Sequence, residues 1–460
     1  MGSRSGFFEA VHCLARWVSS LIVIRKSHFN LSRSLPLPST MPHNDRSPLL
    51  GHAENGRSHT YNSVEGLPPP SLSTRVSAIL KAEGEPTWFQ SYKWFLFGSY
   101  FNVLLVFVPL SAFAHYLHWD VAFRFSFSFF AIMPLAKLLG DSTEQMSARL
   151  GQTLAGLLNA SFGNAVEIIV GVAALLQDEL RIVQTSMLGS ILSNILLVLG
   201  CSFLAAGLKR QESVFQVTAA QASSSLMTLA CITLVIPAAY SSTLEDSHSN
   251  ERGLLIISRG TALVLLFIYC AYIYFQLKSH AFLYQPRDSD DDGNPLPEDA
   301  EPVEHEEANM SVIAAGVSLL GVTVVTSFCA DYLVSSIEEF AERYHVPKPF
   351  IGLILLPIVA NAAEHVTAVW MAMKNQMELT ITICVGSSIQ IAAFVVPLLV
   401  VVGWISGHEL TLFFANFETI ILFVSVVLVN TLIQDGKSNY MEGLMLLGLY
   451  FVVSLAFWVA

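Results

Sequence analysis

The sequence predicts an all-α polytopic membrane protein with about eleven transmembrane helices, because three observations agree. Of its 460 residues, 53% are hydrophobic and only 13% are charged, whereas about 25% are charged in a typical soluble domain. Apolar segments of about 20 residues, enough to cross a hydrocarbon core of about 30 Å as a helix, recur along the chain. One short motif with a carboxylate occurs twice. We therefore expect one extra N-terminal helix followed by two inverted five-helix repeats.

The first 92 residues are predicted to form a disordered cytosolic tail. They are rich in Ser, Pro, His and Arg, and such a segment cannot bury enough apolar surface to fold alone. Within it, Asp45, Leu49 and Leu50 fit the acidic dileucine pattern that sorting adaptors bind. A plain linker is the alternative interpretation of this stretch.

The apolar segments divide the rest of the chain into domains. The expected spans are 94–114, 121–139, 151–176, 183–207, 218–240, 256–277, 311–334, 349–373, 379–405, 410–432 and 440–459. The expected domains are an extra first helix (93–120), a first repeat (121–277), an acidic cytosolic linker (278–310) and a second repeat (311–460).

The linker and the basic residues indicate how the chain is oriented. Ten of the twenty residues from Asp288 to Glu307 are acidic. They lack the ligand order of an EF-hand, so a solvated linker is favoured over a calcium sensor. Lys and Arg concentrate in the tail and after the second, fourth, sixth, eighth and tenth spans, and the positive-inside rule makes those connections cytosolic. An odd number of spans then puts the N-terminus in the cytosol and the C-terminus in the lumen.

The repeated motif pairs an asparagine with a glutamate inside an apolar span. Asn164 and Glu167 recur as Asn361 and Glu364, and 361 minus 164 and 364 minus 167 both give 197. A charge at the bilayer centre costs at least about 2.5 to 3.5 kcal/mol, so the two carboxylates call for a functional explanation. A spacing of three residues puts each pair on one helix face. Two such faces offer the oxygen ligands that a hard cation prefers, which predicts an ion site shared by two repeats.

The same offset extends into the following spans. Gly189 and Ser190 match Gly386 and Ser387, and Ser193 matches Gln390. Five spans in each half force the second half to enter from the opposite side, which is the inverted repeat of secondary transporters. The polar side chains that these facing spans add to the site are Ser190, Ser193, Asn194, Ser387, Ser388 and Gln390. Serines in membrane helices often only pack helices together, which is the alternative for each of them.

The two motifs resemble the signature repeats of the calcium/proton exchangers of the CAX family, within the calcium:cation antiporter superfamily, and most of all those of fungal vacuoles. The likeness covers roughly residues 90–460, and Ala360 stands where that family has Gly. It implies that calcium moves from the cytosol into the vacuole in exchange for protons, across the vacuolar membrane. It also implies that Glu167 and Glu364 bind calcium and carry protons. Asn164 and Asn361 would be ligands or hold a helix break.

The resemblance assigns further residues to the pathway. Ser387 and Gln390 would line the site, and Glu144 matches an acidic position at the cytosolic entrance. His365 follows the second glutamate directly and can titrate near neutral pH, so we expect it to modulate proton coupling; a core histidine is the alternative.

Other functional classes are disfavoured. A sodium/calcium or manganese exchanger of the same superfamily is the nearest alternative, and a cation channel would leave the inverted repeat unexplained. An intramembrane enzyme would need a motif such as H-E-x-x-H or a nucleophile elbow, and the sequence has neither. The net charge of −12 comes largely from the linker, and no basic stripe indicates nucleic acid. The expected partners are calcium, protons, the bilayer and a sorting adaptor, with no cofactor.

Overall fold

The computed structural model describes residues 86–459 except for residue 151, residues 243–248 and residues 281–308. The dileucine residues Asp45, Leu49 and Leu50 and most of the acidic linker lie outside the described residues. The described helical elements are α3 (Trp88–Phe97), η2 (Tyr100–Val106), α4 (Phe107–Tyr116), α5 (Val121–Leu150), α6 (Gln152–Phe162), α7 (Ala165–Leu176), α8 (Leu180–Leu192), η3 (Ser193–Val198), α9 (Leu199–Gly207), α10 (Val217–Ser242), α11 (Ser249–Tyr274), η4 (Phe275–Ser279), α12 (Val312–Tyr344), α13 (Lys348–Phe350), η6 (Ile351–Leu355), α14 (Leu356–Ala360), α15 (Ala362–Met373), α16 (Met377–Gln390), η7 (Ile391–Val395), α17 (Val396–Ser406), α18 (Asn416–Leu432) and α19 (Tyr440–Val459).

The described chain is a helical membrane protein, as predicted. Seven of its helices are long and apolar enough to cross a membrane, or nine if each of two bent pairs counts as one span. The other two expected spans correspond to the broken pair α6 and α7 and to α18, whose 17 residues are slightly short. The number eleven therefore stays a prediction.

The first expected span is not one straight helix. Its two parts, Trp88–Phe97 and Tyr100–Tyr116, are bent by 86° at the break between them. The helix also begins earlier than expected, inside the last residues of the predicted tail. The reason is a capping box in which Thr87 and Gln90 satisfy each other's backbone N–H groups.

Two further spans are broken at the asparagines of the repeated motif. α6 ends at Phe162 and α7 begins after Asn164, whose φ of −113° and ψ of 38° leave the helical region. In the second half the chain bends by 58° around Asn361, between α14 and α15. Pro357 lies in the first turn of α14, directly after the π-helical segment η6.

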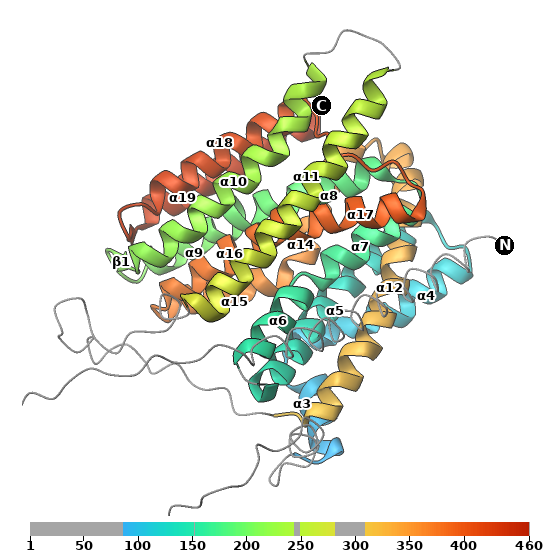
Figure 1. Cartoon of the computed structure of the whole chain (residues 1–460). Coiled ribbons are helices and arrows are strands. Elements are labelled where there is room, and N and C mark those ends of the chain that lie inside the picture. Colours follow the sequence, from blue (N-terminus) through green and yellow to red (C-terminus); the bar gives the residue numbers. More distant parts are fainter. Residues whose placement is uncertain (1–85, 151, 243–248, 281–308, 460) are drawn as a thin grey trace, which may run out of the picture. The chain divides into compact units, whose positions relative to one another are not determined.

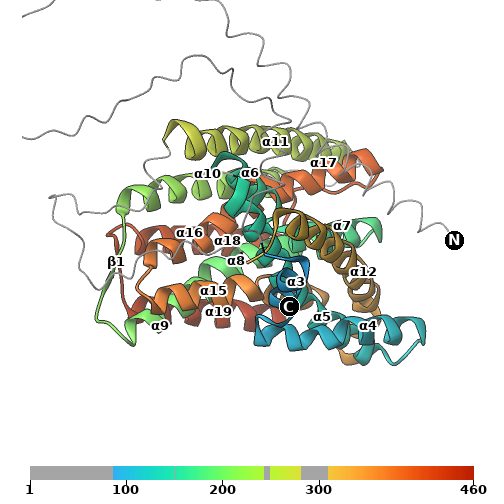
Figure 2. The same cartoon turned by 90° about the horizontal axis from the view of Figure 1, so that it is seen from below.

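The two spans that follow the breaks form the centre of the described fold. In the span made of α8, η3 and α9, 83% of the most apolar 18-residue stretch is buried. The corresponding share is 72% in the span made of α16, η7 and α17, and only 28% in the span of α11. Figure 2 shows α8 and α16 between a layer that holds α10 and α11 and one that holds α15 and α19. Polar residues on these central spans therefore face protein, where they can form a site.

A pair of long helices, α5 and α12, pack along each other beside this centre. Phe125 stacks on Phe340 with ring centroids 4.1 Å apart, and Arg124 forms an ion pair with Glu339. A short antiparallel ladder is the exception to an all-α fold in the described chain: β1 (Ser213–Val214) pairs with β2 (Lys437–Ser438), with Ser213 opposite Ser438. This ladder joins the connection after α9 to the connection before α19.

Candidate ion-binding site

The two motif glutamates occupy equivalent positions, each in the first turn of a helix that begins after a break. Glu167 lies in the first turn of α7 and Glu364 in the first turn of α15. The free N–H groups and the dipole of a helix N-terminus favour a carboxylate there. The sequence had suggested one continuous helix face for each pair. That interpretation was wrong, because Asn164 and Asn361 sit in the break itself and do not continue the helix.

Glu364 is bound by side chains from both halves of the chain. Asn194 Nδ2 donates to Glu364 Oε2 at 3.1 Å and lies 3.0 Å from Ser387 Oγ. Ser387 Oγ lies 3.1 Å from Glu364 Oε1 and 2.8 Å from Asn164 Oδ1. Asn164 Nδ2 in turn donates to Gln390 Oε1 at 2.6 Å. These five side chains form one hydrogen-bonded group, which we call the amide cluster.

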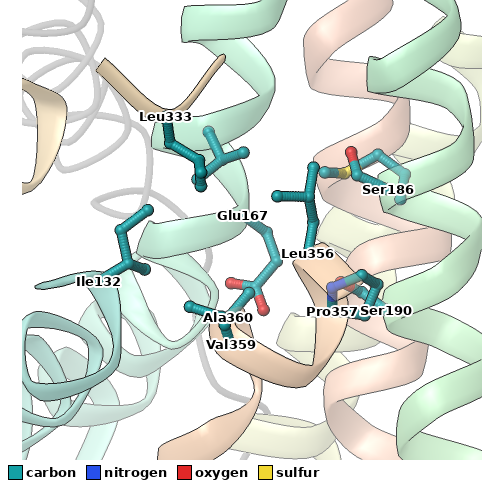
Figure 3. A pocket seen from close by; sticks show the side chains of 11 residues that line it. Ile132, Glu167, Ser186, Ser190, Leu333, Leu356, Pro357, Val359 and Ala360 are labelled. Carbon is teal, nitrogen blue, oxygen red and sulfur yellow. The ribbon is translucent and has the colours of Figure 1, made fainter. Parts of the chain in front are cut away.

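Glu167 faces a narrow pocket next to this cluster. Its side chain is 4% exposed, and its carboxylate points between α14 and the neighbouring helices (Figure 3). The residues that line the pocket are Ile132, Glu167, Val170, Ser186, Met187, Ser190, Leu333, Leu356, Pro357, Val359 and Ala360. The lining is apolar apart from Glu167 and two serines, so the carboxylate has little besides the helix N-terminus to stabilise a charge.

The site has excess negative charge. Glu167 lines its pocket together with Ser190, whose carbonyl oxygen accepts from Asn361, three residues before Glu364. Neither the amide cluster nor the pocket lining contains Lys or Arg. Glu167 is buried and Glu364 is half-buried, and two such carboxylates without a basic partner are costly unless a cation or protons neutralise them.

Two buried amide oxygens also lack a hydrogen-bond donor. Asn361 Nδ2 donates to the Ser190 carbonyl oxygen at 3.3 Å, but Asn361 Oδ1 has no partner among the described residues, and the same holds for Asn194 Oδ1. Buried polar atoms are seldom left unpaired. Carboxylate and amide oxygens together are the ligands that Ca²⁺ prefers, so this donor set suits a hard cation.

The remaining predicted residues are distributed around the site. Ser190 lines the Glu167 pocket. Ser193 is buried beside Tyr450 of α19, outside the amide cluster. His365 is half-buried. Glu144 is exposed on α5 and is not a member of the amide cluster.

Packing differs between the two sides of the breaks. On one side η6 and α14 pack tightly on α8, where a Cβ added at Gly189 would lie 2.2 Å from the Leu353 carbonyl oxygen. In the repeat, α6 corresponds to η6 and α14, and α16 corresponds to α8. α6 packs on α5 and α11, but it is not among the described elements that pack closely on α16. A Cβ added at Gly386, the counterpart of Gly189, would meet nothing within 4 Å. The described fold is thus closed on one side of the motifs and looser on the other.

Comparisons with known proteins agree with this architecture. The model of the sodium/calcium exchanger protein family matches residues 120–278 and 314–459. The vacuolar calcium ion transporter of Schizosaccharomyces pombe is 47% identical over 79% of this chain and 85% of its own. The Ca²⁺/H⁺ antiporter of Aphanothece halophytica is 40% identical over 78% of this chain and 96% of its own. The solved structure of native YfkE superposes with a TM-score of 0.65 at 33% identity, covering 78% of this chain and all of that one.

Proposed function

Because this chain belongs to the sodium/calcium exchanger protein family, and within it to the calcium/proton exchangers of the CAX family, we propose how it exchanges the two ions. It is a multi-pass membrane transporter and not an enzyme. We propose that Ca²⁺ from the cytosol binds between Glu167 and Glu364 and is released into the vacuole in exchange for protons. The observation that carries this proposal is that Glu167 and Glu364 lie beside unpaired amide oxygens and have no basic partner in the amide cluster or the pocket lining.

The charge of the site explains why the two ions exchange. Two ionised glutamates are neutralised equally by one Ca²⁺ or by two protons. The empty, doubly negative site is the costly form to enclose in a low-dielectric core. The site would therefore close around Ca²⁺ or around protons but not while empty, and this exclusion couples the two fluxes.

The proton gradient supplies enough free energy for accumulation. Each pH unit is worth about 1.4 kcal/mol for each proton. A lumen two pH units below the cytosol could then sustain roughly a 10⁴-fold calcium gradient with two protons per ion, with no contribution from the membrane potential.

Alternating access follows from the two halves. We propose eleven spans, an extra first helix (93–120) and two inverted five-helix repeats (121–277 and 311–460), with the N-terminus and the acidic linker (278–310) in the cytosol and the C-terminus in the lumen. The tight packing of η6 and α14 on α8 would close the lumenal side, and the looser side at α6 and α16 would be the cytosolic entrance. During transport, α6 would pack tightly on α16 and close the cytosolic side, while η6 and α14 would move away from α8 and open the lumenal side.

The other predicted residues take supporting roles in this proposal. Asn164 and Asn361 supply amide oxygens next to the carboxylates, and Ser190, Ser193, Ser387 and Gln390 line the pathway. Glu144 attracts cations at the entrance, and His365 tunes the response to pH. Asp45, Leu49 and Leu50 direct the protein to the vacuolar membrane through a sorting adaptor.

Uptake of ⁴⁵Ca by purified protein in acid-loaded proteoliposomes tests the exchange. Uptake should require the pH gradient and should collapse when a protonophore is added. Uptake that persists with protonophore and follows an imposed sodium gradient would instead identify a sodium/calcium exchanger. Replacement of calcium by manganese in the same vesicles measures the second divalent substrate.

A further inference from the structure

A second structural feature lies outside the ion site, at the bend in the first span. We propose that α3 lies in the plane of the membrane, in the headgroup region of the bilayer, and anchors the start of α12 there. The partner of its exposed face is the lipid interface.

The orientation of α3 follows from the bend. α3 makes an angle of 86° with Tyr100–Tyr116, the segment that follows it and packs on α5 and α12. If that segment crosses the bilayer, α3 runs along the membrane surface. The angle is fixed by Asn102, whose Nδ2 donates to the carbonyl oxygens of Phe95 and Leu96 at 2.9 and 3.2 Å. Gly98 permits the turn, since a Cβ there would lie 2.5 Å from the Trp94 carbonyl oxygen.

The exposed side of α3 carries large aromatic and aliphatic side chains. Trp88 is 52% exposed, Phe89 79% and Leu96 40%. Positions 88, 89, 92 and 96 fall on one stripe of an α-helix, and Trp88 stacks on Tyr92 with ring centroids 6.0 Å apart. Lys93 is exposed beside this stripe. Helices at a membrane interface typically combine Trp and Tyr with basic residues.

A second face of α3, which carries Ser91, is bound to the start of α12. Ser91 is fully buried, and its Oγ accepts the backbone N–H of Ser311 at 3.3 Å. Ser311 caps α12, its side chain accepting from Ala314 N. Gln145 of α5 fixes the same point, since its Oε1 accepts the backbone N–H of Met310 at 3.1 Å. α3 therefore carries the exposed stripe on one face and is hydrogen-bonded to the first residues of α12 on another.

Lipid is the occupant that the neighbouring surface favours. Directly after the bend, Tyr100 is 97% exposed and Val103 74%, and these residues belong to a candidate span. The stripe on α3 is continuous along the chain with this lipid-facing surface. Burial of the apolar stripe in the membrane interface would stabilise α3 at the membrane surface in proportion to the apolar area that is removed from water.

Quenching of tryptophan fluorescence tests this proposal on the full-length protein. The protein has seven Trp residues, so the emission of Trp88 is obtained as the difference between wild type and Trp88→Phe. Both are reconstituted in phosphatidylcholine vesicles with or without bromine near the top of the acyl chains, and acrylamide serves as the aqueous quencher. Trp94→Phe is the matched control, because Trp94 lies on the same helix but is partly buried against the core.

The proposal predicts that brominated lipid removes most of the Trp88 emission, that acrylamide removes little of it, and that Trp94 responds less to the lipid. Quenching of Trp88 by acrylamide alone would overturn it, since the helix would then be in water. Resistance to both quenchers would also overturn it, since protein would then cover the stripe. If Trp88→Phe gives too little protein, the emission gained by Phe89→Trp over wild type provides the same measurement.

Discussion

Ser387 of the second half lies 2.8 Å from Asn164 of the first half, through its Oγ and the Asn164 Oδ1. The same hydroxyl lies 3.1 Å from Glu364 Oε1. A hydroxyl has one proton and can donate to only one of the two oxygens at a time. Ser387 thus links the two repeats at the candidate site and leaves one amide or carboxylate oxygen free for a cation.

We predict that Ser387→Ala weakens calcium binding while the protein remains folded. Loss of one hydrogen bond to a charged group costs about 1.5 to 3 kcal/mol, equivalent to a roughly tenfold or greater increase in the apparent KM for calcium. The matched control is Ser388→Ala, because the Ser388 hydroxyl donates to the Cys384 carbonyl of its own helix. Equal KM values for the two variants would show that Ser387 only packs helices.

We predict that Gly189→Ala and Gly386→Ala differ in stability. The added methyl group at Gly189 would overlap the Leu353 carbonyl, whereas at Gly386 it would meet open space. Gly189→Ala should therefore lower the melting temperature of the purified protein, and Gly386→Ala should leave it near the wild-type value. If α6 packs on α16 at Gly386 in the other state of the transport cycle, the added methyl group would obstruct that packing, and Gly386→Ala should still slow calcium uptake. Wild-type turnover in Gly386→Ala would argue against that packing.

We predict that His365→Ala retains calcium transport but changes its pH profile or its preference between calcium and manganese. A protonated imidazole next to Glu364 would oppose an incoming cation, so its removal should extend uptake to lower cytosolic pH. Uptake of each ion is measured from acid to neutral pH at matched protein levels. Superimposable normalised curves for wild type and variant would leave His365 with a packing role.

We predict that Leu49→Ala combined with Leu50→Ala moves the protein from the vacuolar membrane to other membranes. The reason is that a sorting adaptor reads both leucines of the acidic dileucine pattern. Transport by the purified variant should be unchanged, since the tail is separate from the ion site in the sequence. Fluorescence microscopy that shows unchanged vacuolar localisation would reduce the motif to a chance match.

The sequence allowed the class of fold and the central residues to be predicted, because both depend on strong local patterns. Long apolar segments indicate membrane helices wherever they occur, and the carboxylates of Glu167 and Glu364 are conspicuous in such segments. Their shared offset also led to Ser387 and Gln390, which the structure brings together with Asn164.

The remaining features depend on geometry that the repeat does not encode. Asn194 holds Glu364, but its counterpart at the same offset is Ile391, so the repeat gave it no special weight. Its only sequence signal is its place one helical turn after Ser190. The break at Asn361 and the bend after Phe97 depend on tertiary contacts that apolar periodicity cannot predict.

The most direct test of the account is ⁴⁵Ca uptake driven by a pH gradient in proteoliposomes that contain wild type, Glu167→Gln or Glu364→Gln. Each substitution removes half of the charge that holds Ca²⁺ but keeps the size of the side chain. Glu338→Gln is the control, because Glu338 is an exposed glutamate paired with Lys348 at 2.8 Å. The account predicts that both site variants lose uptake while their yield and elution profile match wild type, and that the control transports normally. Wild-type uptake in either site variant would contradict it.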